Sequence, residues 1–121
     1  MKPLFICYSK CTTCQKARKW LDEQQIEYTE RPIKDQNPTA EELLSWQRIS
    51  GLPLRKFFNT SGMLYRELNL KKRLPQMSEE EMLSLLASDG MLVKRPLLIT
   101  SRAAIPGFRP EAWEKALTEE A

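Results

Sequence analysis

The chain of 121 residues has no histidine and only three cysteines, which leaves too few ligands for several kinds of site. An ordinary structural zinc site takes four Cys or His ligands, and the sequence argues against one. Three cysteines in a chain this long also do not make a secreted disulfide framework. We therefore expect a cytoplasmic protein with reduced cysteines. In a reducing compartment, a close pair of cysteines more often binds metal or exchanges electrons.

Long apolar runs and a strong net charge are missing too. The run from Leu4 to Cys7 is too short for a signal-peptide core, and no stretch is long enough to span a membrane. Lys and Arg exceed Asp and Glu by 19 to 16, and a formal charge of +3 is too small to predict direct nucleic-acid binding. An anionic small substrate remains compatible with this charge.

What is present is typical of one globular domain. Hydrophobic residues make up 41% of the chain and charged residues 29%. The length is that of a single domain, and no repeat or change of composition marks a boundary. We expect one domain over residues 1–121.

The central motif is Cys11-Thr-Thr-Cys14, which joins the apolar run Leu4 to Cys7 to an amphipathic helix. A thiol at the start of a helix faces unpaired N–H groups and the positive end of the helix dipole, and both favour the reactive thiolate. Cys11 precedes the first turn, whereas Cys14 shares the apolar face of the helix. Cys11 is therefore the candidate nucleophile and Cys14 the candidate resolving thiol.

The helix end alone does not activate a thiol fully. Lowering a cysteine pKa from about 8.5 to about 6 takes roughly 3.4 kcal/mol. Helix-end effects supply about 0.3–1 kcal/mol and reach about 2 kcal/mol in partly buried geometry. Nearby cations must contribute, and the local candidates are Lys10, Lys16 and Arg18.

Other interpretations of the cysteines exist. A lone C-x-x-C also occurs as half of a zinc site or as an accidental pair. With Cys7 the spacing becomes C-x3-C-x2-C, which radical-SAM iron–sulfur enzymes share. Those enzymes are built on a much longer partial barrel, and Cys7 within an apolar strand is explained as a small buried core residue.

The remaining elements follow from periodicity and capping signals. We expect a second strand over Ile26 to Ile33, a strand over Leu97 to Thr100 with a hairpin partner at Ala104-Ile105, and a last helix from Pro110. Between the second and third strands the pattern is helical, with capping boxes at Thr39–Glu42 and Ser78–Glu81 and stops at Gly51 and Gly90. A helix opened by Pro53 is expected there as well. The cations in this part, which we expect on solvated faces, are Arg55, Lys56, Lys71, Lys72 and Arg73.

A reactive C-x-x-C after the first strand of such an order is the thioredoxin-like arrangement. The predicted fold is α/β, thioredoxin- or glutaredoxin-like, with a mixed four-stranded sheet. Its helical insertion covers about residues 35–93, between strands 2 and 3.

Three motifs carry a family resemblance over Leu4 to Leu117. Cys11-Thr-Thr-Cys-Gln-Lys-Ala17 resembles the redox motif of the Spx-like branch of the ArsC family. Lys94-Arg-Pro-Leu97 resembles that family's Arg-Pro before the third strand, and Gly107-Phe-Arg109 resembles its C-terminal arginine motif. The family includes arsenate reductases, Spx regulators and small uncharacterised relatives.

The resemblance implies a set of site residues. In the arsenate reductases one cysteine attacks the oxyanion and three arginines hold it, which corresponds here to Cys11, Arg95 and Arg109. The remaining arginine position corresponds to Asn59, which cannot supply a positive charge or the same fork of donors. Arsenate specificity is therefore in doubt. The family also implies a cis peptide before Pro96.

Two function classes follow from the resemblance. One is a thiol-dependent reductase of an oxyanion or a disulfide, without a bound cofactor and with glutathione, glutaredoxin or thioredoxin as electron donor. The other is an Spx-like regulator that binds RNA polymerase and uses the cysteine pair as an oxidation switch. The C-x-x-C motif favours either one over a binding module with idle cysteines. Tyr8 and Ser9 could donate hydrogen bonds beside the motif or serve only the turn.

Overall fold

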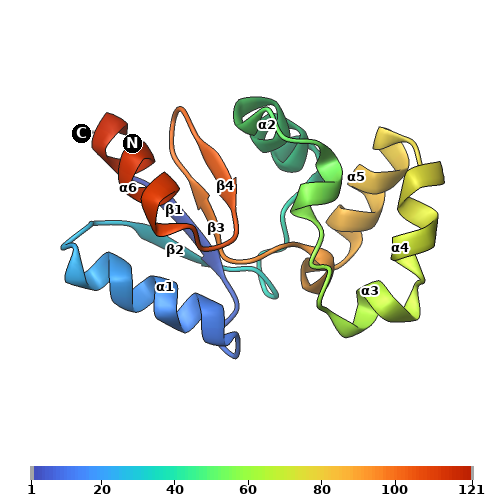
Figure 1. Cartoon of the computed structure of the whole chain (residues 1–121), viewed down its shortest axis with the longest axis horizontal. Helices are drawn as coiled ribbons and strands as arrows, with labels where there is room; N and C mark the ends of the chain where they lie inside the picture. The colour runs from blue at the N-terminus through green and yellow to red at the C-terminus, as the bar shows by residue number, and fades with distance from the viewer. Residues whose placement is uncertain (1, 121) are drawn as a thin grey trace. The chain divides into compact units, whose positions relative to one another are not determined.

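The computed structural model describes residues 2–120, and the chain divides into two compact units (Figure 1). The first unit combines the N-terminal segment up to Pro32 with the C-terminal segment from Arg95. The second unit is Ile33–Lys94. No helix among the described residues has the length and apolar character needed to cross a membrane.

The first unit is built on a four-stranded sheet with the order β2-β1-β3-β4. Its central strand β1 pairs in parallel with β2 and antiparallel with β3, and β3 pairs antiparallel with β4. The mixed four-stranded sheet is therefore confirmed. The strands are β1 Leu4–Cys7, β2 Thr29–Pro32, β3 Leu97–Ile99 and β4 Ala104–Pro106.

Two helices, α1 (Thr12–Glu23) and α6 (Pro110–Glu120), cover one face of this sheet. Side chains alternate along a strand, so Phe5 and Cys7 point to the same face of β1. They pack there with apolar residues of both helices and of β3, which are Cys14, Ala17, Leu21, Leu98, Trp113 and Leu117. The cysteine turn thus follows a strand that is mostly buried.

Two strands are shorter than predicted. Ile26 does not begin β2, because its N–H donates to the Leu21 carbonyl at 3.1 Å and Gln25 adopts a φ of 57°, which turns the chain out of α1. Thr100 does not extend β3, because its N–H donates to the Ala103 carbonyl at 2.8 Å and closes the hairpin turn. At the start of β2 and at the end of β3, hydrogen bonds within a turn thus take the place of hydrogen bonds between strands.

The second unit is helical, which confirms the predicted insertion between the second and third strands. Both capping boxes are formed, at Thr39 with Glu42 and at Ser78 with Glu81, and Gly51 ends its helix with a left-handed φ of 70°. The helices are α2 Ala40–Ser50, η1 Leu54–Phe57, α3 Met63–Glu67, α4 Leu70–Arg73, η2 Leu74–Gln76, α5 Glu79–Ser88 and η3 Gly90–Leu92.

Two details of this unit differ from the sequence pattern. The apolar residue Ile49 of α2 is 41% exposed, whereas Trp46 on the same helix is buried. Gly90 does not simply end α5, because Asp89 is the C-cap and Gly90 begins η3. A side chain at position 90 would overlap the Ile33 carbonyl oxygen, so the glycine allows two backbone segments to approach closely.

Candidate functional site

The site is formed where the chain leaves β1 and enters α1. Cys11 is the residue before the first turn of α1, with extended backbone at φ −91° and ψ 121°. Its N–H donates to the Tyr8 carbonyl at 3.0 Å, and its carbonyl accepts the Gln15 N–H at 3.0 Å. The thiol of Cys11 is half-buried at the N-terminus of the helix. This is the position at which helix N–H groups stabilise an anion.

The pKa of the Cys11 thiol lies below its ordinary value. Partial burial acts in the opposite direction and is the largest single influence. It is outweighed by the N–H group and thiol of Cys14, the N–H group of Thr13 and the positive charge of Arg95, all of which lower the pKa. The thiolate of Cys11 is therefore favoured although the residue is partly removed from water.

Cys14 has the opposite character. Its side chain is fully buried, and burial, together with the charge of Cys11, raises the pKa of the Cys14 thiol to about 12. The Tyr8 N–H donates to the Cys14 sulfur at 3.3 Å and offsets part of this rise. Cys14 thus stays protonated beside a thiolate, and its thiol stabilises that thiolate.

The pairing of β1 with β3 explains why Arg95 lies near the cysteines. Leu4 pairs with Ile99 and Ile6 with Leu97, so continuing the antiparallel register places Arg95 opposite Tyr8. The Arg95 guanidinium lies over the Tyr8 ring, 5.1 Å from its centroid. This cation–π contact orients a charge that acts on Cys11.

The cations expected from the local sequence behave differently. Arg18 donates to both carboxylate oxygens of Glu30, at 2.9 and 3.0 Å, and to the Cys7 sulfur at 3.4 Å. The activating cation that the structure identifies is instead Arg95, 84 positions after Cys11. Arg95 lies near Cys11 because the pairing of β3 with β1 returns a distant part of the sequence to the cysteine turn.

Cys7 is a core residue, as predicted, with 2% of its surface exposed. Burial is the main cause that raises the pKa of its thiol to about 11, and the nearby Glu30 carboxylate adds to it. The guanidinium of Arg18 acts against both and does not overcome them. Cys7 is therefore an unreactive thiol at neutral pH.

The predicted cis peptide between Arg95 and Pro96 is confirmed. The Gly107 N–H donates to the Pro96 carbonyl at 2.8 Å, which joins the turn after β4 to the segment that carries Arg95. Arg109 follows in that turn, is exposed, and immediately precedes α6. A cation gains nothing from the positive end of a helix dipole, so helix stability does not explain an arginine there.

Asn59 lies in the second unit. Its side-chain nitrogen donates to the Met91 carbonyl at 3.5 Å, and its side-chain oxygen accepts from the Ser61 hydroxyl at 3.2 Å. Its N–H donates to the Leu92 carbonyl at 2.8 Å. Asn59 thus has a clear local role, and its part in anion binding stays a prediction.

The sequence left open whether Tyr8 acts beside the cysteine motif or serves only the turn, and it did not indicate a contact with Arg95. The Tyr8 N–H contacts Cys14, its carbonyl accepts from Cys11, and its ring supports Arg95. The signal that could have found it is the strand register, which periodicity alone does not fix. Within residues 2–120, no group of three or more Cys, Asp or Glu side chains is placed to hold a metal ion.

The parallel β1–α1–β2 unit, the cysteine turn at the start of α1 and the cis proline before β3 define a thioredoxin-like protein. The chain belongs to the ArsC family, whose profile matches residues 7–116.

Curated relatives include both uncharacterised proteins and regulators. The uncharacterized protein YusI of Bacillus subtilis (strain 168) is 53% identical, over 95% of this chain and 98% of the relative. The regulatory protein MgsR of the same strain is 31% identical, over 88% of this chain and 82% of the relative. The global transcriptional regulator Spx 2 of Bacillus anthracis is 28% identical, over 90% and 82%.

Similar solved structures include another protein related to the ArsC family and one described as a possible arsenate reductase. A crystal structure of an ArsC family related protein from Bacteroides fragilis superposes with a TM-score of 0.92 at 60% identity, covering 95% of this chain and 97% of that one. A structure from Streptococcus mutans UA159, described as a possible arsenate reductase, gives 0.84 at 44% identity, covering 93% and 97%.

Proposed function

We propose that this protein is a cytoplasmic thiol-dependent oxidoreductase of ArsC type, with Cys11 as nucleophile and Cys14 as resolving thiol. The observation that carries the proposal is the placement of two thiols three residues apart, with Cys11 half-buried at the start of α1 and Cys14 fully buried within it. This placement shifts their pKa values in opposite directions. A favoured thiolate beside a protonated partner thiol is the arrangement that dithiol–disulfide exchange requires.

The proposed reaction with a disulfide proceeds in two exchanges. The Cys11 thiolate attacks one substrate sulfur, the substrate S–S bond breaks, and the second substrate thiolate leaves. Cys14 then loses its proton, attacks the Cys11 sulfur and releases the first substrate half as a thiolate. The substrate gains two electrons, and the Cys11–Cys14 disulfide forms. Two thiols of glutathione, glutaredoxin or thioredoxin return the pair to the reduced state.

The first exchange prepares the second. The charge of Cys11 raises the Cys14 pKa, and the Cys14 thiol stabilises the Cys11 thiolate. Once Cys11 is a mixed disulfide, its charge is gone and this part of the rise disappears. The Tyr8 N–H still contacts the Cys14 sulfur and favours its thiolate. Cys14 therefore becomes easier to deprotonate at the step in which it must attack.

Arg95 and Arg109 are the proposed anion-binding residues. Charge-assisted arginine contacts hold an oxyanion or a substrate carboxylate more strongly than neutral donors do. Because Asn59 stands where the resemblance places a third arginine, we expect weak arsenate binding and weak stabilisation of its transition state. Disulfide substrates do not need that third charge, so thiol–disulfide exchange is the favoured reaction.

A second candidate function is an Spx-like regulator that binds RNA polymerase and uses the same pair as an oxidation switch. The identity to MgsR, at 31%, favours this class. Retention of the reduced protein on immobilised RNA polymerase, without turnover of any disulfide, would support it over the reductase.

The test is a disulfide-reduction assay coupled to glutaredoxin or thioredoxin, run beside an arsenate-reduction assay. We expect turnover of the disulfide, and we expect Cys14→Ser to accumulate the mixed disulfide at Cys11. The matched control Cys7→Ser should leave turnover unchanged because Cys7 is not part of the exchange. Asn59→Arg should increase arsenate reduction. Efficient arsenate turnover by the unmodified protein, with no disulfide turnover, would contradict the proposal.

A further inference from the structure

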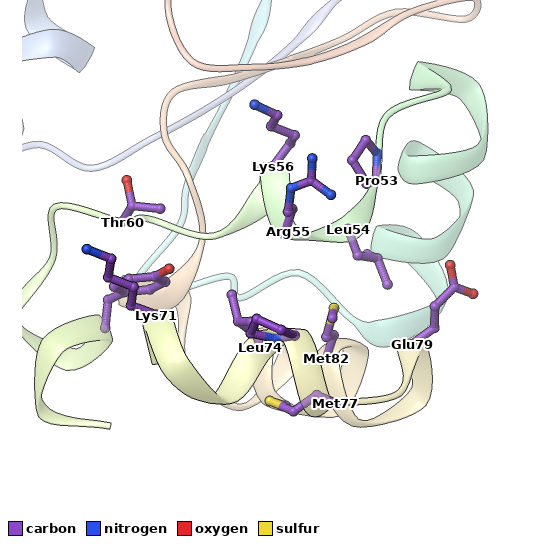
Figure 2. Close-up of a pocket in the computed structure, with 12 residues that line it drawn as sticks. Pro53, Leu54, Arg55, Lys56, Thr60, Lys71, Leu74, Met77, Glu79 and Met82 are labelled. Carbon is purple, nitrogen blue, oxygen red and sulfur yellow. The ribbon is translucent and has the colours of Figure 1, made fainter. Parts of the chain in front are cut away.

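The second unit contains a cavity of about 610 Å³ that the cysteine chemistry does not use. It lies between η1 and the segment from α4 to the start of α5 (Figure 2). Sites for small molecules usually measure about 300–1,000 Å³. All of its lining residues belong to Ile33–Lys94, so the cavity is complete within one compact unit.

The wall of this cavity is largely apolar. Leu54 and Leu74 are 3% and 6% exposed and anchor the cavity in the core of the unit. Met77 and Met82 lie beside them, and Figure 2 shows Leu54 and Met82 turned toward one another across the space. Methionine side chains adapt to irregular apolar surfaces. The wall is suited to a ligand with an apolar body.

Three cations lie among the residues that line the cavity. Arg55 and Lys56 extend from η1, Lys71 extends from α4, and Glu79 is the single carboxylate among the lining residues. Lys71 lies at one end of the cavity, beside Thr60, and Glu79 lies at the other. Over residues 2–120 none of the three cations forms an ion pair with a carboxylate. All three cations are exposed, as the sequence predicts, and they line the same cavity.

We propose that this cavity binds a small amphipathic anion, with its apolar body against Leu54, Leu74 and Met82 and its anionic group at Lys71. The apolar wall removes the ligand body from water, and the cations select a carboxylate, sulfonate or phosphate group. Thr60 and Tyr65 supply hydroxyl groups at the same cavity. The site is independent of Cys11 and is expected to bind in either redox state of the cysteines.

The experiment uses two fluorescent probes of similar shape. 8-Anilinonaphthalene-1-sulfonate carries an apolar body and an anionic group, and 1-anilinonaphthalene lacks the sulfonate. We expect the full chain to bind the sulfonate probe more tightly, with affinity that falls as salt increases. Titrations with a ¹⁵N-labelled chain should show amide shifts in η1 and α4.

Variants separate the cavity from the general surface charge. Lys71→Gln should weaken the sulfonate probe about threefold, as expected for an exposed ion pair, and Arg55→Gln should weaken it less. Lys72→Gln is the matched control, because it removes the same charge from the adjacent residue of α4, which does not line the cavity. Met82→Trp should displace both probes by filling the space. Circular dichroism checks that each variant is folded.

Equal loss in Lys71→Gln and Lys72→Gln would overturn the proposal, because general surface charge would then explain binding. Equal binding of the two probes would overturn it as well, because the cavity would then be merely apolar. Amide shifts confined to other elements would place the probe elsewhere. None of these results depends on reductase activity, so the cavity and the proposed function can fail separately.

Discussion

At the scale of single residues, the central feature is that two thiols three positions apart have opposite tendencies to ionise. Cys11 is half-buried among donors and a cation, which lower its pKa. Cys14 is fully buried, and burial raises its pKa. The same turn therefore supplies both an attacking group and a protonated partner.

The pH dependence of alkylation checks this difference. Because the Cys11 pKa is lowered from its ordinary value, its thiolate forms at pH values where an ordinary cysteine is protonated. The Cys7 and Cys14 pKa values, about 11 and about 12, place their thiolates above that range. We expect iodoacetamide at pH 7 to label Cys11 first, as measured by tandem mass spectrometry. Faster labelling of Cys7 or Cys14 would contradict the assignment of the nucleophile.

Tyr8 is expected to act through Arg95. Tyr8→Ala removes the ring beneath the guanidinium, a contact worth about 0.5–1 kcal/mol, so Cys11 alkylation near neutral pH should slow about two- to fivefold. Tyr8→Phe keeps the ring and should stay close to the unmodified protein. In an Arg95→Gln background, Tyr8→Ala should have no further effect. An equal loss in both backgrounds would mean that Tyr8 acts on the turn alone.

The site residues were predictable to different degrees. Cys11 and Cys14 follow from a local motif at a strand-to-helix junction, and Arg95 was found through the family resemblance. The Tyr8–Arg95 contact could not be predicted, because it depends on the register between β1 and β3. Register is set by tertiary packing of strands far apart in sequence.

At the scale of elements, local signals predicted helix ends well. The capping boxes at Thr39 and Ser78 were read from residues three positions apart, and both form. The second strand was predicted three residues too long at its start, because Ile26 completes the turn after α1 instead of joining the ladder. Apolar alternation does not distinguish these two uses of a short segment.

Gly90 gives a test at this scale. Gly90 does not adopt a positive φ, so with open space around it Gly90→Ala would stabilise the protein by about 0.4–1 kcal/mol through the unfolded chain. The structure predicts the opposite sign, because the new Cβ would overlap the Ile33 carbonyl oxygen and lie 2.7 Å from the Asn37 side-chain oxygen. We expect a loss of about 1–3 kcal/mol in the free energy of unfolding, measured with urea. An unchanged or higher stability would contradict this close approach.

At the scale of the whole molecule, the chain holds two candidate sites in two compact units. The cysteine turn lies in the unit built on the sheet, and the cationic cavity lies in Ile33–Lys94. The sequence predicted the sheet and the helical insertion. It did not predict the cavity, because Arg55 and Lys56 on η1 and Lys71 on α4 are apart in the sequence and line one cavity only in the folded unit.

The most direct measurement of the central claim is mass spectrometry of the tryptic peptide that starts at Cys11 and ends at Lys16. Cleavage after Lys10 and Lys16 leaves Cys11 and Cys14 in one peptide and Cys7 in another. After mild oxidation and blocking of free thiols, we predict that this peptide is unblocked and about 2 Da lighter, as an internal disulfide requires, and that reduction reverses the change. A peptide with two blocked thiols, or a disulfide between Cys11 and Cys7, would contradict the Cys11–Cys14 exchange.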